Sequence, residues 1–157
     1  MARGAASTKQ WDQATKDNPN IKTVIMTAGG NDIIQDTTLE PDCRAGGTLC
    51  DDELKKLGYA LVQLWNKMSA AGVVDIVHVL YAPDANGGTL MKQSAANNGG
   101  LMLLCSKVMG PGHCHLVDSA PYVTGAYAVD GIHPLSDAND RLAAAVEKFM
   151  ADQHIRR

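Results

Sequence analysis

Residues 23–32 read Thr-Val-Ile-Met-Thr-Ala-Gly-Gly-Asn-Asp, and this stretch decides the fold. Val24, Ile25 and Met26 form a short apolar run, which is typical of a strand buried on both faces of a parallel sheet. Two glycines follow, and they permit a tight turn and a close approach of a ligand to the main chain. In an open α/β sheet the ligand crevice lies beyond the carboxyl ends of the strands. We therefore expect Asn31 to reach that crevice, where its amide N–H groups can stabilise a developing oxyanion.

A second polar motif lies near the other end of the chain, in Asp130–Gly131–Ile132–His133–Pro134. An Asp three residues before a His, in a turn bounded by glycine and proline, can accept a hydrogen bond from the imidazole Nδ1–H. That bond fixes the tautomer and leaves Nε2 free as a general base. The alternative is a hydrogen-bonded turn that caps the last helix. We favour the catalytic interpretation, because Asn31 is independently expected at the same crevice.

The two motifs together resemble the SGNH/GDSL hydrolase family: Gly-x-Asn-Asp ends one strand, and Asp-x-x-His-Pro precedes the last helix. The resemblance extends roughly from Gly4 to the C-terminal helix. It implies an α/β fold, a flavodoxin-like three-layer α/β/α sandwich with a parallel sheet, and a serine esterase. It assigns His133 as the base, Asp130 as its orienting carboxylate, and the Asn31 amide and the Gly4 backbone N–H as oxyanion donors. Gly4 can alternatively do no more than open a turn. Asp32 is expected to anchor its loop.

The family's nucleophile lies on a Gly-Asp-Ser turn after its first strand, and that tripeptide is absent from this sequence. The resemblance places that first strand beside the strand that leads to Asn31, so the edge of residues 24–26 is expected to be unpaired. Three explanations stay open. The chain can be a fragment that lacks its N-terminal part, or a homo-oligomer or another polypeptide can cover the edge. Finally, Ser7 can replace the nucleophile, although the spacing to Gln10 favours a helix N-cap for Ser7.

The four cysteines fall into two close pairs, Cys43/Cys50 and Cys105/Cys114, and each pair brackets a segment that contains glycine. We expect two local disulfides and, with them, an extracellular or periplasmic location. His113 and His115 flank Cys114 and raise the alternative of a metal site, but the cysteine spacing differs from that of structural zinc knuckles. The first residues, 1–4, are too short and polar for a signal peptide.

Size and composition indicate one globular domain over residues 1–157. The chain is 45% hydrophobic and 20% charged, with a formal net charge of −3. No basic stripe of the kind that nucleic acid requires is visible. No apolar run approaches the roughly 20 residues of a membrane span.

The expected elements alternate between helix and strand, which favours the three-layer sandwich. His78 is expected to be a hydrogen-bonded core or edge residue, and Ser119 to be a turn residue. In chain order the expected elements are a helix over 9–16, a strand over 24–26, a polar surface loop over 33–52, a helix over 52–71, a strand over 73–81, a loop over 84–100, a buried helical piece over 101–108, a strand over 115–117, and a helix that Ser136 or Asp137 caps and that runs to Phe149.

The sequence therefore predicts a serine esterase that hydrolyses acyl or acetyl esters of small substrates, without a metal or another cofactor and with an unidentified nucleophile. Two alternatives stay open. One is a non-catalytic module that binds an acyl or sugar ligand in the same crevice. The other is a metal-dependent hydrolase that uses Asp130, His133, His113 and His115.

Overall fold

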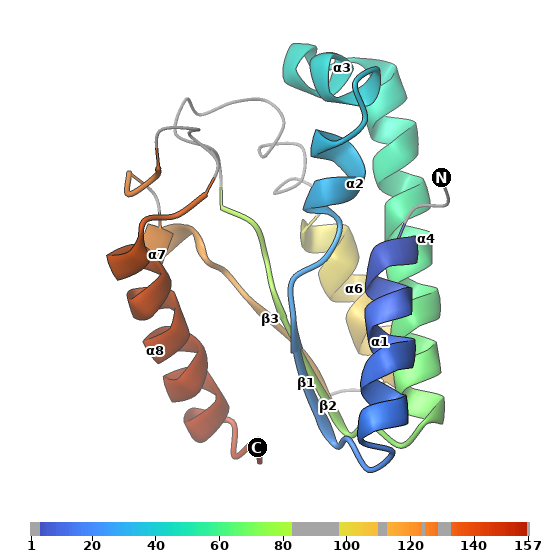
Figure 1. Ribbon diagram of the computed structural model, residues 1–157, viewed down its shortest axis with the longest axis vertical. Helices are drawn as coiled ribbons and strands as arrows, with labels where there is room; N and C mark the ends of the chain where they lie inside the picture. Colours follow the sequence, from blue (N-terminus) through green and yellow to red (C-terminus); the bar gives the residue numbers. More distant parts are fainter. Residues whose placement is uncertain (1–3, 83–97, 110–112, 124, 129–132, 157) are drawn as a thin grey trace.

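A three-stranded parallel sheet forms the centre of the protein. The computed structural model describes residues 4–82, 98–109, 113–123, 125–128 and 133–156. The strands are β1 (Thr23–Met26), β2 (Asp75–Val79) and β3 (Cys114–Val117), in the spatial order β1-β2-β3. All pairings are parallel, with Ile25 opposite Val77 and Val77 opposite His115. Helices lie on both faces of the sheet (Figure 1), so the predicted three-layer α/β/α arrangement is confirmed.

The helices α1 (Ala5–Asp17), α4 (Thr48–Ala70) and α6 (Asn98–Met109) form one layer. The apolar stripe predicted for 52–71 lies on α4. Its side chains pack with Trp11 and Ile76 in the larger of the two main hydrophobic cores. Gly72 follows this helix with φ +91°, the left-handed conformation expected of a glycine that ends a helix. Every residue of the predicted stripe is buried: Leu54, Leu57, Leu61, Leu64, Trp65 and Met68.

The helix α8 (Ser136–Asp152) covers the opposite face of the sheet. Its buried residues Val146 and Met150 pack against Val77, Val79 and Val117. The short helix α7 (Ala120–Val123) follows β3 and adjoins the beginning of α8. The two layers therefore fix β2, the central strand, from both sides, and all four of its residues from Ile76 to Val79 are buried.

The expectation of a surface loop over 33–52 is wrong, because most of this segment is helical. The structure contains α2 (Gly30–Ile34) and α3 (Leu39–Ala45) before α4 begins at Thr48. Leu39 and Cys43 lie one helical turn apart and are both buried. The Asp36 carboxylate accepts hydrogen bonds from the backbone N–H groups of Thr38 and Leu39, at 3.1 and 3.0 Å, and so satisfies donors at the start of α3.

Two predicted helix caps are also wrong. Gly4, not Ser7, precedes α1, and Ser7 lies inside the first turn of the helix. Leu135 precedes α8, and Ser136 is its first residue, so neither Ser136 nor Asp137 is the N-cap. The Asp137 carboxylate instead accepts a hydrogen bond from Arg141 at 2.6 Å, and this bond lowers the pKa of Asp137.

Both predicted disulfides, Cys43–Cys50 and Cys105–Cys114, are present. The first joins α3 to α4, and the second joins α6 to β3. We expect the double variant Cys43→Ala/Cys50→Ala to lose about 2–3 kcal/mol of unfolding free energy, because the broken cross-link no longer restricts the unfolded chain. Urea unfolding measured by circular dichroism checks this value. Titration of free thiols in the denatured wild-type protein is the control, and two or more free thiols would contradict the pairing.

Among the described residues, no helix combines the length and the apolar character that a membrane crossing requires.

Candidate functional site

A cavity of about 330 Å³ lies at the carboxyl ends of the three strands. Residues that follow each strand contribute to its wall, as the general rule for open α/β sheets predicts. The beginning of α8 and the segment before it close the cavity from the other side. The lining residues are Thr27, Gly30, Asn31, Val79, Leu80, Tyr81, Ala82, Ser119, Val123, Tyr127, His133, Pro134, Asn139 and Leu142.

Paired glycines bring the chain from β1 into the cavity wall. Gly29 has φ +104°, and a Cβ atom there would lie 2.6 Å from Leu57 Cδ2, so only glycine fits without strain. A Cβ atom on Gly30 would lie 2.8 Å from Cζ of Tyr81, which means that the tyrosine ring packs directly on this backbone. Asn31 follows at once in α2 and lines the cavity.

Backbone hydrogen bonds fix the position of His133. The carbonyl oxygen of His133 accepts a hydrogen bond from Ala128 N–H at 2.8 Å, and Leu135 N–H donates to Ala126 at 2.9 Å. These bonds form a short antiparallel arm in which Tyr127 pairs with Pro134. His133 is exposed, as a residue at the mouth of a cavity can be. Asp130, its predicted orienting carboxylate, lies outside the described residues.

Asn31 and His133 therefore line one cavity, although a hundred residues separate them in the sequence. This is the arrangement on which the esterase interpretation depends. An amide donor and an imidazole at one small cavity can act on the same acyl group. The roles of oxyanion donor and general base stay predictions.

Gly4 and Ser7 do not belong to this cavity wall. Gly4 N–H donates a hydrogen bond to Asp32 Oδ1 at 2.8 Å, so in this structure that N–H is not available to a substrate oxyanion. The same bond gives Asp32 the anchoring role expected of it, because it ties α2 to the start of α1. Ser7 lies in α1 and is not among the residues that line the cavity.

Several polar residues of the cavity were not predicted from the sequence. The most informative is Ser119, which was expected to be a turn residue. Its side chain is 4% exposed, and its Oγ–H donates a hydrogen bond to the Leu80 carbonyl at 2.5 Å. Tyr81 and Ser119 each follow the end of a strand by two residues. The rule that ligands bind beyond the carboxyl ends of the strands, when applied to β2 and β3, would have predicted both.

The metal-dependent alternative does not fit the geometry. His113 and His115 lie near Asp75, at the amino ends of β2 and β3, whereas His133 lies at the carboxyl ends. His115 Nε2 is 3.2 Å from Asp75 Oδ1, and His113 Nδ1 is 4.0 Å from the same oxygen. Within the described part of the chain, no group of three or more His, Cys, Asp or Glu side chains has the geometry to hold a metal ion.

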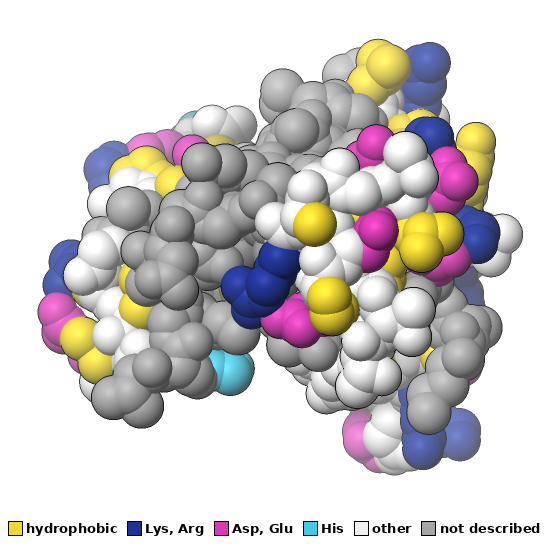
Figure 2. Space-filling model, turned by 90° about the horizontal axis from the view of Figure 1, so that it is seen from above, with side chains coloured by type: hydrophobic (Ala, Val, Ile, Leu, Met, Phe, Trp, Pro, Cys, Tyr) yellow, Lys and Arg dark blue, Asp and Glu magenta, His cyan; other side chains and the backbone are white. Residues whose placement is uncertain are grey.

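Figure 2 views the molecule from the end that contains this cavity. Described Lys and Arg side chains are interspersed with Asp and Glu side chains on this face. Arg141 joins α8 to α7 by donating two hydrogen bonds to the Tyr122 carbonyl, at 3.3 and 3.2 Å. The start of α8, which carries the cavity residues Asn139 and Leu142, is therefore held in place by a neighbouring helix.

Comparison with known proteins supports the fold. No protein-family model matches the chain, and no curated protein sequence matches it. Among solved structures, the fold is similar to that of "a putative arylesterase from Agrobacterium tumefaciens str. C58", with a TM-score of 0.59 and 21% sequence identity. The match covers 92% of this chain and 67% of the Agrobacterium chain. The likeness supports the α/β sandwich fold of this chain.

Proposed function

We propose that this chain is an ester hydrolase domain whose active site is the cavity at the carboxyl ends of the strands. The observation that carries the proposal is that Asn31 and His133 line that one cavity. The likeness of the fold to the Agrobacterium protein supports the same class of reaction. A cavity of about 330 Å³ is at the small end of the range for ligand sites, which favours a short acyl group such as acetyl.

In the proposed reaction, His133 Nε2 removes the proton of the nucleophile as the nucleophile attacks the ester carbonyl, and it gives that proton to the leaving alcohol. His133 then takes a proton from a water molecule, which releases the acyl group as a carboxylic acid and restores the nucleophile. Asp130 holds the imidazole in the productive tautomer, and the Asn31 amide donates hydrogen bonds to the tetrahedral oxyanion. No metal or cofactor takes part. The two disulfides support an extracellular or periplasmic location.

Ser119 is the cavity-lining serine among the described residues, and Ser7 lies outside the cavity. To act as a nucleophile, Ser119 would have to redirect its hydroxyl from the Leu80 carbonyl to His133. Because the Ser119 hydroxyl already donates to the Leu80 carbonyl, a second candidate function is favoured, a module that binds an acyl ligand in the cavity without cleaving it.

Hydrolysis of p-nitrophenyl acetate, with fluorophosphonate labelling and peptide mapping, separates the two functions. If the chain is an esterase, the probe labels one serine, and His133→Ala reduces kcat/KM by about 10²-fold or more through loss of the general base. The matched control is His154→Ala, which removes an exposed imidazole outside the cavity and should leave turnover unchanged. Unchanged turnover in His133→Ala would refute the assignment of the base. Binding of the ester without turnover or labelling would favour the binding module.

A further inference from the structure

Only one of the two expected oxyanion donors is available to a ligand in this structure. The Asn31 amide lines the cavity, but the Gly4 N–H donates to Asp32 Oδ1 at 2.8 Å. Enzymes that cleave esters stabilise the tetrahedral oxyanion with several preorganised hydrogen-bond donors. If the cavity cleaves esters, we therefore expect another residue of its wall to supply a second donor.

The hydroxyl end of Tyr81 lies on the backbone that leads to Asn31. A Cβ atom built on Gly30 would lie 2.9 Å from Tyr81 Oη and 2.8 Å from its Cζ, so the polar end of the ring meets Gly30. Gly30 directly precedes Asn31, and successive Cα atoms are about 3.8 Å apart. Both Tyr81 and Asn31 line the cavity. The phenol hydroxyl and the amide therefore reach the cavity from neighbouring points.

The glycine at position 30 provides room for this hydroxyl. Its φ does not lie in the left-handed region, so the backbone conformation does not itself require glycine there. A side chain at this position would instead displace the end of the Tyr81 ring. Glycine thus keeps the phenol close to the Asn31 backbone.

Hydrogen bonds fix the backbone just before Tyr81. The Leu80 N–H donates to the Val117 carbonyl at 2.9 Å, and the Leu80 carbonyl accepts a hydrogen bond from the buried Ser119 hydroxyl at 2.5 Å. The Tyr81 hydroxyl itself makes no hydrogen bond to another described residue. It is therefore a donor that a ligand can use, carried on a fixed backbone.

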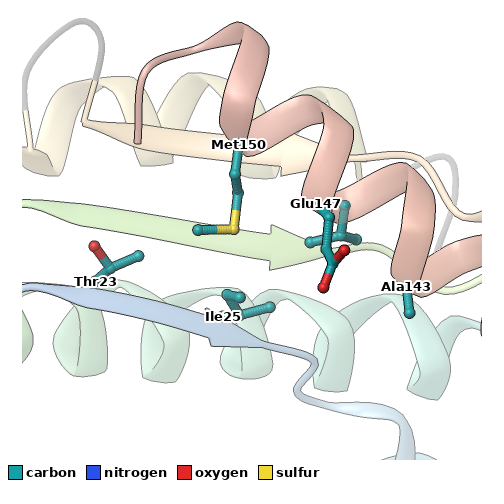
Figure 3. A pocket seen from close by; sticks show the side chains of 6 residues that line it. Thr23, Ile25, Ala143, Glu147 and Met150 are labelled. Carbon is teal, nitrogen blue, oxygen red and sulfur yellow. The ribbon is translucent and has the colours of Figure 1, made fainter. Parts of the chain in front are cut away.

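The groove between β1 and α8 offers no comparable donor among the described residues that line it. These are Thr23, Ile25, Ala143, Val146, Glu147 and Met150 (Figure 3). The Thr23 hydroxyl donates to the Arg156 carbonyl at 2.5 Å, and the Glu147 carboxylate accepts hydrogen bonds but donates none. An oxyanion is therefore better stabilised in the cavity than in this groove.

We propose that Tyr81 is a catalytic residue of the cavity, whose Oη–H donates a hydrogen bond to the ester carbonyl oxygen beside the Asn31 amide. It supplies the donor that the engaged Gly4 N–H does not. The hydrogen bond strengthens as the nucleophile attacks and the oxygen gains negative charge, and it weakens when the carbonyl re-forms. The proton stays on Tyr81 throughout. This inference rests on the proposed function.

Acetate binding and ester hydrolysis test the proposal in Tyr81→Phe, which removes the hydroxyl and retains the ring. Acetate presents a negatively charged oxygen and needs no turnover, so it probes the donors even in a chain that hydrolyses nothing. We expect the Kd for acetate, from an NMR chemical-shift titration, to rise at least about tenfold, because hydrogen bonds to charged acceptors are strong. For p-nitrophenyl acetate, kcat should fall about 10²-fold and KM should change by less than about threefold.

Two further variants sharpen the test. Tyr59→Phe is the matched control, because it makes the same change at a tyrosine that is 69% exposed and lies outside the cavity; both constants should stay unchanged. Asn31→Ala should raise the acetate Kd as Tyr81→Phe does, because the two donors share one oxygen.

The inference and the proposed function fail in different ways. Absence of saturable acetate binding to the wild-type protein, or an unchanged Kd in either Tyr81→Phe or Asn31→Ala, would overturn the inference. An active wild-type enzyme whose kcat survives Tyr81→Phe would overturn it as well. If the wild-type chain binds acetate but hydrolyses no ester, the esterase function fails, whereas a raised Kd in Tyr81→Phe still supports the Tyr81 donor.

Discussion

Replacement of Trp65 by alanine is expected to lower the free energy of unfolding by about 3–5 kcal/mol, because it empties the centre of the larger core. Trp65 is fully buried and lies between α4 and the sheet, where its ring meets the His78 ring edge-on, with centroids 5.7 Å apart. The total stability of a domain of this size is typically about 5–15 kcal/mol, so this single substitution removes a large part of it.

The Trp65 indole also explains why phenylalanine should be tolerated better than alanine. Its Nε1 atom is buried and has no hydrogen-bond partner among the described residues. Trp65→Phe retains most of the apolar volume and removes this unsatisfied donor, so its loss of stability should be clearly smaller than that of Trp65→Ala.

Urea unfolding followed by far-ultraviolet circular dichroism measures these differences without relying on tryptophan fluorescence. Tyr59→Ala is the matched control on the same helix, because Tyr59 is 69% exposed and its replacement should change stability by no more than about 0.5 kcal/mol. A change of similar size in Trp65→Ala and Tyr59→Ala would show that Trp65 does not hold this core together.

The parts of the fold that could be predicted are those whose residues repeat with a regular period. The α4 stripe was found because its leucines repeat at intervals of three and four residues, and all of them are buried. The strands were found from short apolar runs, and their observed bounds differ from the expected ones by two residues or fewer. The helices α2 and α3 were missed because they are too short to show a period. The Asp36 hydrogen bonds and the Cys43–Cys50 disulfide, which fix α3, depend on contacts that the sequence pattern does not contain.

The candidate site was predictable only in part, because some of its residues are placed by tertiary contacts that no local sequence motif indicates. Asn31 occurs in a local motif that indicates an oxyanion donor, and His133 in one that indicates a general base. The rule that ligands bind beyond the carboxyl ends of parallel strands predicted a common location for both. Tyr127 and Asn139 line the same cavity but occur in no such motif. Their position follows from the antiparallel arm before α8 and from the packing of α8 itself. The family resemblance assigned the Gly4 N–H as an oxyanion donor, yet this N–H donates to Asp32, a partner 28 residues away.

Acidification from pH 7.5 to pH 4 is expected to cost about 3 kcal/mol of stability through His78 alone. His78 was predicted to be a hydrogen-bonded core or edge residue. It lies in the core with 2% exposure, and its Nδ1 has no hydrogen-bond partner among the described residues. Burial lowers the pKa of His78 from 6.5 to about 4, because the imidazolium would lose its hydration.

The sign of the effect follows from proton linkage. A folded-state pKa below the unfolded-state value means that, between pH 6.5 and about 4, the unfolded chain binds a proton that the folded chain does not. The contribution of neutral His78 to stability is therefore complete above pH 6.5 and is lost progressively as the pH falls to about 4. One pKa unit corresponds to about 1.4 kcal/mol, so the full difference is worth about 3–4 kcal/mol. About 3 kcal/mol of it is lost by pH 4, where the folded imidazole is half protonated.

The measurement is urea unfolding of the wild-type protein and of His78→Leu at pH 7.5, 5.5 and 4. Other titrating groups are the same in both proteins, so the difference between their pH profiles isolates His78. We expect the variant to lose about 3 kcal/mol less than the wild-type protein over this range, because leucine does not titrate. Leu103→Gln is the control, since it replaces an exposed residue by another that does not titrate and should keep the wild-type profile. Parallel profiles for the wild-type protein and His78→Leu would mean that His78 titrates alike in the folded and unfolded chains, contrary to its burial between the sheet and Trp65.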